Sequence, residues 1–136
     1  MVGIEDVESF LIRMDLEYEE IDEGMFLVRS GEHSLPVVVH YTPPLLVLRL
    51  KVMDLPRDPE GDHGLGKLYR ELLEFNAMDV VHGAYGIEET ELILSDSLQL
   101  ETLGFTDVQA SLESLQMAAS SHMDRIKSLA STKVEG

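Results

Sequence analysis

Apolar residues recur along the chain with two different periods, one typical of helices and one typical of strands. Near the N-terminus they return at three- and four-residue steps, which places five of them on one face of a helix: Ile4, Val7, Phe10, Leu11 and Met14. Between residues 17 and 53, aliphatic and β-branched runs are separated by turn-forming residues. These runs predict three or four consecutive antiparallel strands at Glu17–Ile21, Met25–Ser30, Leu35–Tyr41 and Leu45–Met53.

Alternation is clearest in the run from Leu45 to Met53. Arg49 and Lys51 fall on one side of this strand. The residues on the other side are all aliphatic: Leu46, Leu48, Leu50 and Val52. Such a pattern is typical of a strand that packs one face on a core and turns the other to water.

The second half of the chain predicts a helix, a hairpin and a long helix. The segment Asp54–Gly64 is rich in Pro, Gly and Asp, which predicts a loop. A helix follows over about Leu65–Phe75, and Asn76 suits its end. The inward residues of this helix are Leu65, Leu68, Leu72 and Phe75. Val80–Ile87 and Thr90–Ser95 then predict a hairpin.

The last helix has the strongest pattern in the chain. Thr106 followed by Gln109 matches a capping box, which predicts the start of the helix. An apolar stripe then continues for more than five turns through Val108, Leu112, Leu115, Ala119, Ile126 and Leu129. This helix is longer than a sheet of short strands needs. Either it lies diagonally across the whole sheet, or its distal part from about His122 packs on a second subunit.

Together these elements predict an α+β fold with a single antiparallel β-sheet of five or six strands covered by helices, in the order α-β-β-β-(β)-α-β-β-α. The length of 136 residues fits a single domain spanning residues 1–136, with 44% apolar residues for its core. The apolar runs are far shorter than the about 18 to 20 residues of a membrane span, and no targeting segment is recognised at the N-terminus. We expect a soluble, cytoplasmic protein.

Composition narrows the classes of partner. The chain has no Cys, which excludes disulfides, zinc knuckles and thiol nucleophiles. Its 26 Asp and Glu residues against 10 Lys and Arg give a formal net charge of −16, so nucleic acid and anionic membranes are poor partners. Nine of the acids lie in the first 24 residues, where Arg13 is the only basic residue. They either keep the surface soluble or form an electrostatic face that steers basic partners.

A phosphate-binding pattern occurs in the loop Asp58–Gly66 and the start of the next helix. Gly61–Lys67 matches the first seven positions of a phosphate-cradling loop. Leu68, however, stands where a Ser or Thr would bind magnesium, and no strand ends directly before the motif. A flexible loop with helix-starting glycines is therefore favoured over nucleotide binding.

The same loop also carries acids at alternate positions, as a calcium-binding loop does. These acids are Asp58, Glu60 and Asp62. The match fails in detail, because His63 stands where Gly is required and Tyr69 stands where the bidentate Glu should be. Adventitious binding of a cation is the alternative to an empty loop.

No arrangement of side chains predicts a reaction. The histidines are not spaced as metal ligands: His33, His40, His63, His82 and His122. We expect His40 and His82 to lie in strands, as packed or surface residues. No catalytic residue, cofactor or metal ligand is assigned. The alternative is a small enzyme or regulatory scaffold whose site is assembled across strands, with His and carboxylate side chains converging in one enclosed pocket.

Four segments of the second half form a recognisable series: Leu68–Asn76, His82–Ile87, Leu92–Leu94 and Leu98–Leu103. They comprise a helix ending in Asn, a small-residue strand, a hydrophobic strand and an L-x-L-x-x-L lead into the last helix. This series resembles the YbjN-type family and the wider class I type III secretion chaperone-like fold. The resemblance covers Leu68 to Leu129 by these patterns and Ile4 to Met53 by element order.

The resemblance implies a homodimer with a non-catalytic, chaperone-like role in holding an extended segment of another polypeptide. A free sheet edge accepts such a segment through backbone hydrogen bonds. For the partner-binding patch we predict Phe10, Met14, Phe26 and Val28, with the core as the alternative location of all four. In a competing interpretation the apolar surface serves only the homodimer, and regulation acts through partner proteins.

Overall fold

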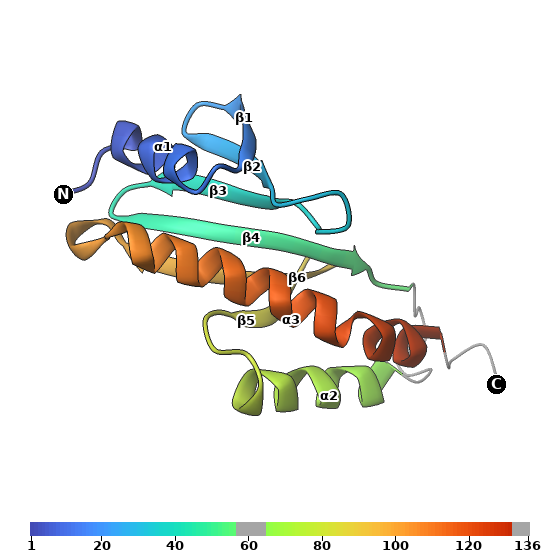
Figure 1. Cartoon of the computed structure of the whole chain (residues 1–136). Coiled ribbons are helices and arrows are strands. Elements are labelled where there is room, and N and C mark those ends of the chain that lie inside the picture. The colour runs from blue at the N-terminus through green and yellow to red at the C-terminus, as the bar shows by residue number, and fades with distance from the viewer. Residues whose placement is uncertain (57–64, 132–136) are drawn as a thin grey trace.

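The computed structural model describes residues 1–56 and 65–131 (Figure 1). In chain order its elements are α1 (Ile4–Arg13), β1 (Glu17–Asp22), β2 (Met25–Arg29), β3 (Val37–Thr42), β4 (Leu45–Asp54), α2 (Leu65–Met78), β5 (Ala84–Glu88), β6 (Glu91–Gln99), the short 3-10 helix η1 (Leu100–Thr102) and α3 (Phe105–Ser131). The strands form one six-stranded antiparallel sheet in the order β1-β2-β3-β4-β6-β5. The predicted α+β class and element order are confirmed, with six strands.

One face of the sheet carries the core. The aliphatic side of β4 is buried as predicted, with Leu46, Leu48 and Leu50 fully inaccessible to solvent. Figure 1 shows α1 and α3 on one face of the sheet and α2 beside β5 at its edge. On the opposite side of β4, Arg49 and Lys51 are exposed. The sheet therefore separates a packed face from an open face along the same strands.

Helix α3 crosses the sheet diagonally in Figure 1 and continues past it to α2. Its predicted apolar stripe is buried along its whole length. The distal part packs within the chain, where Arg125 Nε lies 3.2 Å from Glu71 Oε1 of α2. Of the two predicted arrangements, the structure shows the first: α3 lies across the sheet, and its distal part packs on α2 of the same chain.

The start of α3 differs from the predicted capping box. The helix begins at Phe105, one residue before Thr106, and the cap is formed by Gly104, whose backbone N–H donates to Asp107 Oδ2 at 2.8 Å. The prediction based on Thr106 and Gln109 is therefore wrong. A carboxylate three residues after a glycine satisfies the same free backbone donor.

The connection between α2 and β5 also differs from the sequence prediction. Helix α2 extends to Met78, so Asn76 lies inside it, and β5 begins at Ala84 rather than Val80. His82 therefore precedes the strand, whereas His40 lies in β3 as predicted. The reason is that the Asn76 amide bonds the backbone of Tyr85 instead of ending the helix.

Some predictions fall on residues 57–64, which lie outside the described residues. They include the acids Asp58, Glu60 and Asp62 of the calcium-like pattern, His63, and most of the motif Gly61–Lys67. Within residues 1–56 and 65–131, no group of three or more His, Asp or Glu side chains is placed to hold a metal ion. No helix in those ranges is long and apolar enough to cross a membrane.

Candidate functional site

The four residues predicted for partner binding do not form one surface patch. Phe26 and Val28 of β2 are 1% and 0% exposed and face Val39 and Val37 of β3 in the core. Phe10 and Met14 are half-buried and pack against that core. The strand half of the predicted patch is therefore not accessible in this fold. A contact with a partner stays a prediction for Phe10 and Met14.

Phe10 takes part in an aromatic junction between α1 and α3. Its ring meets that of Phe105 edge-on, with 6.1 Å between the ring centroids. The guanidinium carbon of Arg13 lies 4.1 Å above the centre of the same Phe105 ring, a cation–π contact. The junction anchors the short helix α1 to the start of the long helix.

Met14 borders a hollow between the end of α1 and α3. We call it the Met14 hollow; its lining consists of Met14, Leu16, Ser30, Gln109, Leu112, Glu113 and Gln116, and its volume is about 170 Å³. The amide nitrogen Nε2 of Gln116 is buried and has no hydrogen-bond partner among the described residues. A buried amide donor without an acceptor is costly. The hollow therefore offers apolar contacts and one free donor to a bound group.

This hollow lies at one edge of the sheet. Leu16 directly precedes β1, and Ser30 directly follows Arg29, which is paired with Glu17 in the sheet. Strand β1 is the outermost strand on that side. A chain laid along the free edge of β1 would thus reach the hollow at the end of its path.

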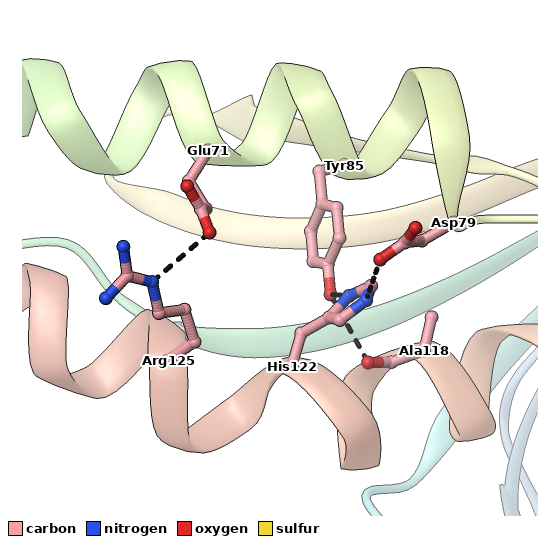
Figure 2. Close-up of polar contacts among 6 residues, drawn as sticks. All are labelled: Glu71, Asp79, Tyr85, Ala118, His122 and Arg125. Atoms are coloured by element: carbon pink, nitrogen blue, oxygen red, sulfur yellow. Dashed lines mark hydrogen bonds and ion pairs between the residues drawn. The ribbon is translucent and has the colours of Figure 1, made fainter.

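A second cluster joins α2, β5 and α3 around His122 (Figure 2). Its imidazole is 8% exposed and stacks on Phe75, with the ring centroids 3.7 Å apart and the planes 3° from parallel. The Nδ1 atom lies 2.7 Å from the Tyr85 hydroxyl, and Nε2 lies 3.2 Å from Asp79 Oδ2. We assign the Tyr85 hydroxyl as donor to Nδ1 and the Nε2 hydrogen as donor to Asp79.

The chemistry of the His122 cluster is that of a packed hydrogen-bond network. Burial, together with the nearby charge of Asp79, raises the pKa of Tyr85 above its usual range. The phenol therefore stays protonated and acts as a donor. Because both ring nitrogens of His122 are engaged within the chain, neither is left to exchange a proton with a bound substrate.

The edge of the sheet at β5 is partly closed by α2. The side-chain oxygen of Asn76 accepts from the Tyr85 N–H at 2.7 Å, and the Asn76 amide nitrogen donates to the Tyr85 carbonyl at 3.2 Å. The Asn76 side chain thus satisfies both backbone groups of Tyr85 in the outer strand, as a neighbouring strand would do. This makes β1 the more open of the two sheet edges.

Beside this closed edge lies an apolar surface of α2 and β5. Tyr69, Leu73 and Ile87 are 37%, 68% and 51% exposed. Together with Leu72, Asn76, Tyr85, Gly86 and Leu92 they surround a hollow of about 230 Å³. We call this the α2–β5 surface. Large apolar side chains exposed together are typical of a protein contact.

The basic residues of the open sheet face are paired with acids. Arg49 lies 3.4 Å from Glu88, and Lys51 lies 3.0 Å from Asp54 and 3.2 Å from Glu91. Hydrogen bonds with Asp54 and Glu91 raise the pKa of Lys51. These cations are therefore shared with neighbouring carboxylates and do not form a basic patch.

A family model matches the chain almost from end to end. The model is CesT_Tir_1, a type III secretion chaperone family, and it covers residues 2–132. The chain belongs to the CesT_Tir_1 family. Membership agrees with the resemblance seen in Leu68–Asn76 and the later segments. A comparison with curated proteins found no match.

Solved structures with the same fold include members of both groups named from the sequence. A chain of the ExoU–SpcU complex from the type III secretion system of Pseudomonas aeruginosa is 12% identical, with a TM-score of 0.67 over 92% of this chain and 98% of that one. YbjN, a putative transcription regulator from E. coli, is also 12% identical, with a TM-score of 0.65 over 91% of this chain and 93% of that one. A chain of the complex between the Yersinia pestis secretion chaperone SycH and a YscM2 fragment is 19% identical, with a TM-score of 0.59 over 84% and 93%.

The sequence of this member of the CesT_Tir_1 family did not predict the buried polar contacts of the two sites. His122 meets partners that lie 37 and 43 positions earlier in the chain. Gln116 is one of several polar residues in α3, and only the packing shows its amide to be buried. The sequence places Asn76 near a helix end and shortly before a small-residue strand, which is the available signal for its contact with Tyr85.

Proposed function

We propose that this member of the CesT_Tir_1 family is a non-enzymatic, chaperone-like binding protein that holds an extended segment of a partner polypeptide. The segment adds to the free edge of β1, and one of its side chains enters the Met14 hollow. The observation that carries the proposal is the buried, unpartnered Gln116 amide in that hollow, at the end of the open sheet edge. The predicted cytoplasmic location stays a prediction.

The chemistry of the hollow supports an extended chain as its occupant. A polypeptide carbonyl supplies the acceptor that Gln116 Nε2 lacks, and Met14 and Leu16 supply apolar contact. Strand addition gives affinity through backbone bonds, and alternate side chains give selectivity. Structures with the same fold include the HopA1–SchA chaperone–effector complex and the secretion chaperone SycH in complex with a YscM2 fragment, which agrees with this kind of partner.

The His122 cluster supports binding rather than catalysis. His122 and Asp79 do converge, as the enzyme alternative required. Their polar atoms, however, are satisfied within the chain, and the phenol of Tyr85 is held protonated. The cluster therefore serves the packing of α2 on α3.

The test begins with an array of unfolded and amphipathic peptides, from which the tightest binder is measured by fluorescence anisotropy. Gln116→Leu keeps the volume of the side chain and removes the donor, so we expect roughly tenfold weaker binding. Ser120→Ala, at an exposed position of the same helix that lines neither hollow, is the matched control and should bind as the parent does.

Proline scanning of the bound peptide identifies the strand. Proline at alternate positions should abolish binding, because each removes a backbone donor on one side of the added strand. A protein indifferent to every peptide in the array, or a peptide that tolerates proline at every position, would contradict the proposal.

We propose further that the protein is a homodimer, with the α2–β5 surface as its interface. The exposure of Leu73 and Ile87 beside an edge closed by Asn76 favours side-chain packing between copies over strand pairing. Light scattering should give twice the chain mass of 15.2 kDa. Leu73→Glu should yield monomers, whereas Ile12→Glu, at a similarly exposed position on α1, should not. A monomeric parent protein would overturn this assignment.

A further inference from the structure

A third surface lies between α3 and the segment that connects α2 to β5. It is a groove of about 580 Å³. Ala110, Ser114, Ala118 and Ser121 line it from α3. The opposite wall is formed by Met78, Asp79, Val81 and His82. We call it the Met117 groove, after the methionine that borders it. It is separate from the Met14 hollow and from the α2–β5 surface.

The walls of the Met117 groove are fixed in place. The Ser114 hydroxyl accepts from the His82 N–H at 3.0 Å and donates to the His82 carbonyl at 3.2 Å. Gly83 then passes so close to the sheet that an added Cβ would lie 2.5 Å from the Ser95 carbonyl oxygen. At the other end, His122 holds Asp79. The groove is thus formed before any partner binds, which lowers the entropic cost of binding.

The rim of the groove carries exposed apolar side chains. Met78 and Val81 are each 82% exposed, and Met117 is 70% exposed. Among the large apolar side chains of the described residues, only Met1 at the N-terminus has a comparable exposed fraction, 75%. Methionine adapts its shape to varied apolar partners. A cluster of such side chains around a groove is typical of a docking surface.

The charge of the groove selects the partner. Asp79 and Glu113 line it, and none of its lining residues within the described ranges is Lys or Arg. A second copy of the chain would bring the same acids against themselves in a two-fold contact, which like-charge repulsion disfavours. A partner with Lys or Arg beside its apolar face complements the groove.

The shape of the groove favours a helix over a strand. Its α3 wall runs from Ala110 to Ser121, about 17 Å or three helical turns. The small residues along this wall let a second helix approach closely. No strand belongs to either wall, so an extended chain would find no row of backbone groups there.

We propose that the Met117 groove binds an amphipathic helix of a partner polypeptide, with the apolar face of the helix against Met78, Val81 and Met117 and its Lys or Arg residues beside Asp79 and Glu113. This is a second binding mode, which does not depend on strand addition at β1. Apolar anchors at i, i+3, i+4 and i+7 fit a groove of this length.

The test uses a synthetic helical peptide of about 18 residues with leucines on one face and lysines on both flanks. Fluorescence anisotropy on the full chain should show saturable binding. The double variant Val81→Ser, Met117→Ser should bind roughly tenfold more weakly. The substituted side chains are exposed, so the fold is retained. Ile12→Ser, exposed on α1, is the matched control and should bind as the parent does.

Two further peptides separate the charge from the apolar contact. A peptide of the same composition in scrambled order, and one with glutamates in place of the lysines, should each bind at least tenfold more weakly. Equal binding of all three peptides would overturn the proposal. So would a loss of affinity in the Ile12→Ser control as large as that in the groove double variant.

Light scattering of the groove double variant completes the test. An unchanged oligomeric state supports a helix of a partner as the occupant. Conversion of a dimer to monomers by this variant would make the groove an interface between copies and would overturn the proposal. Gln116→Leu should leave binding of the helical peptide unchanged, so failure of strand addition at β1 and failure at the groove are distinguishable.

Discussion

Gly83 and Asn76 set the path of the chain between α2 and β5 at the scale of single residues. Gly83 has a φ of +90°, a backbone conformation that residues with a Cβ rarely adopt. Asn76 bonds both backbone groups of Tyr85, nine residues later. One residue lets the chain approach the sheet, and the other fixes the strand that follows.

Gly83→Ala should destabilise the protein by at least about 2 kcal/mol. The new methyl group would lie 2.5 Å from the Ser95 carbonyl oxygen and 2.9 Å from Leu115, in a backbone conformation unfavourable to alanine. Gly86→Ala is the matched control, because nothing lies within 4 Å of its Cβ position. Urea unfolding followed by circular dichroism checks both. Equal stabilities for the two variants would contradict the role given to Gly83.

Because Tyr85 is buried, it makes the stability of the folded protein depend on pH in the alkaline range. Its pKa is raised in the folded protein by desolvation and by Asp79, so the folded state keeps the phenolic proton where the unfolded state loses it. Above about pH 10 the unfolded state therefore binds fewer protons, and stability falls as pH rises. Below that pH both states are protonated, and this group adds no pH dependence.

Tyr85→Phe should cost about 1 kcal/mol at pH 8, because His122 loses its hydroxyl partner. As the pH rises from 8 to above about 10, the difference from the parent should shrink, since only the parent has the buried phenol. Unfolding free energies of both proteins over this range measure the effect. A difference that stays constant above pH 10 would show that Tyr85 ionises as easily in the folded state as in the unfolded one.

At the scale of elements, α3 joins the parts of the molecule. Its first turn meets α1 through Phe105, its middle covers β4 and β6, and its last turns pack on α2. The apolar stripe of α3 predicts this coverage well, because burial of one helix face repeats with the helical period. The cap was mispredicted, because Thr106 and Asp107 both lie within three residues of Gly104 and both can cap a helix. Only the backbone geometry shows that the Asp107 side chain accepts from the Gly104 N–H.

Asp107→Ala should therefore destabilise the protein by about 1 kcal/mol, the usual value of a helix-capping bond. Asp107 Oδ2 accepts from the Gly104 N–H at 2.8 Å. Thr106→Ala, one residue away, should be nearly neutral. Thermal unfolding of the two variants checks the assignment. A larger loss for Thr106→Ala would restore the capping box predicted from sequence.

At the scale of the whole molecule, the fold persists while the sequence varies. Structures only 12 to 19% identical share it. The pattern of apolar positions, rather than particular residues, therefore specifies the arrangement. The net charge of −16 is a property of this chain that acts on the molecule as a whole. Acidic side chains repel one another more in the compact state than in the unfolded chain.

Salt should accordingly stabilise the protein. Raising sodium chloride from about 0.01 M to about 1 M shortens the range of charge interactions from about 30 Å to about 3 Å, so the urea midpoint should rise. The double variant Glu17→Gln, Glu19→Gln removes two charges from the exposed edge strand and should show a smaller rise. A midpoint that falls with salt would mean that attractive ion pairs outweigh the repulsion.

The sequence by itself determined the order of the elements, the buried side of β4, the stripe of α3 and the acidic surface. These features follow from local periodicity and composition, which each segment carries independently of its partners. Tertiary structure decided which faces meet. Both sides of β2 carry large apolar residues, so packing shows that Phe26 and Val28 face the core. Packing alone also leaves Gln116 Nε2 without an acceptor. The contacts of His122 and Asn76 likewise join distant segments, whose meeting depends on how the helices close over the sheet.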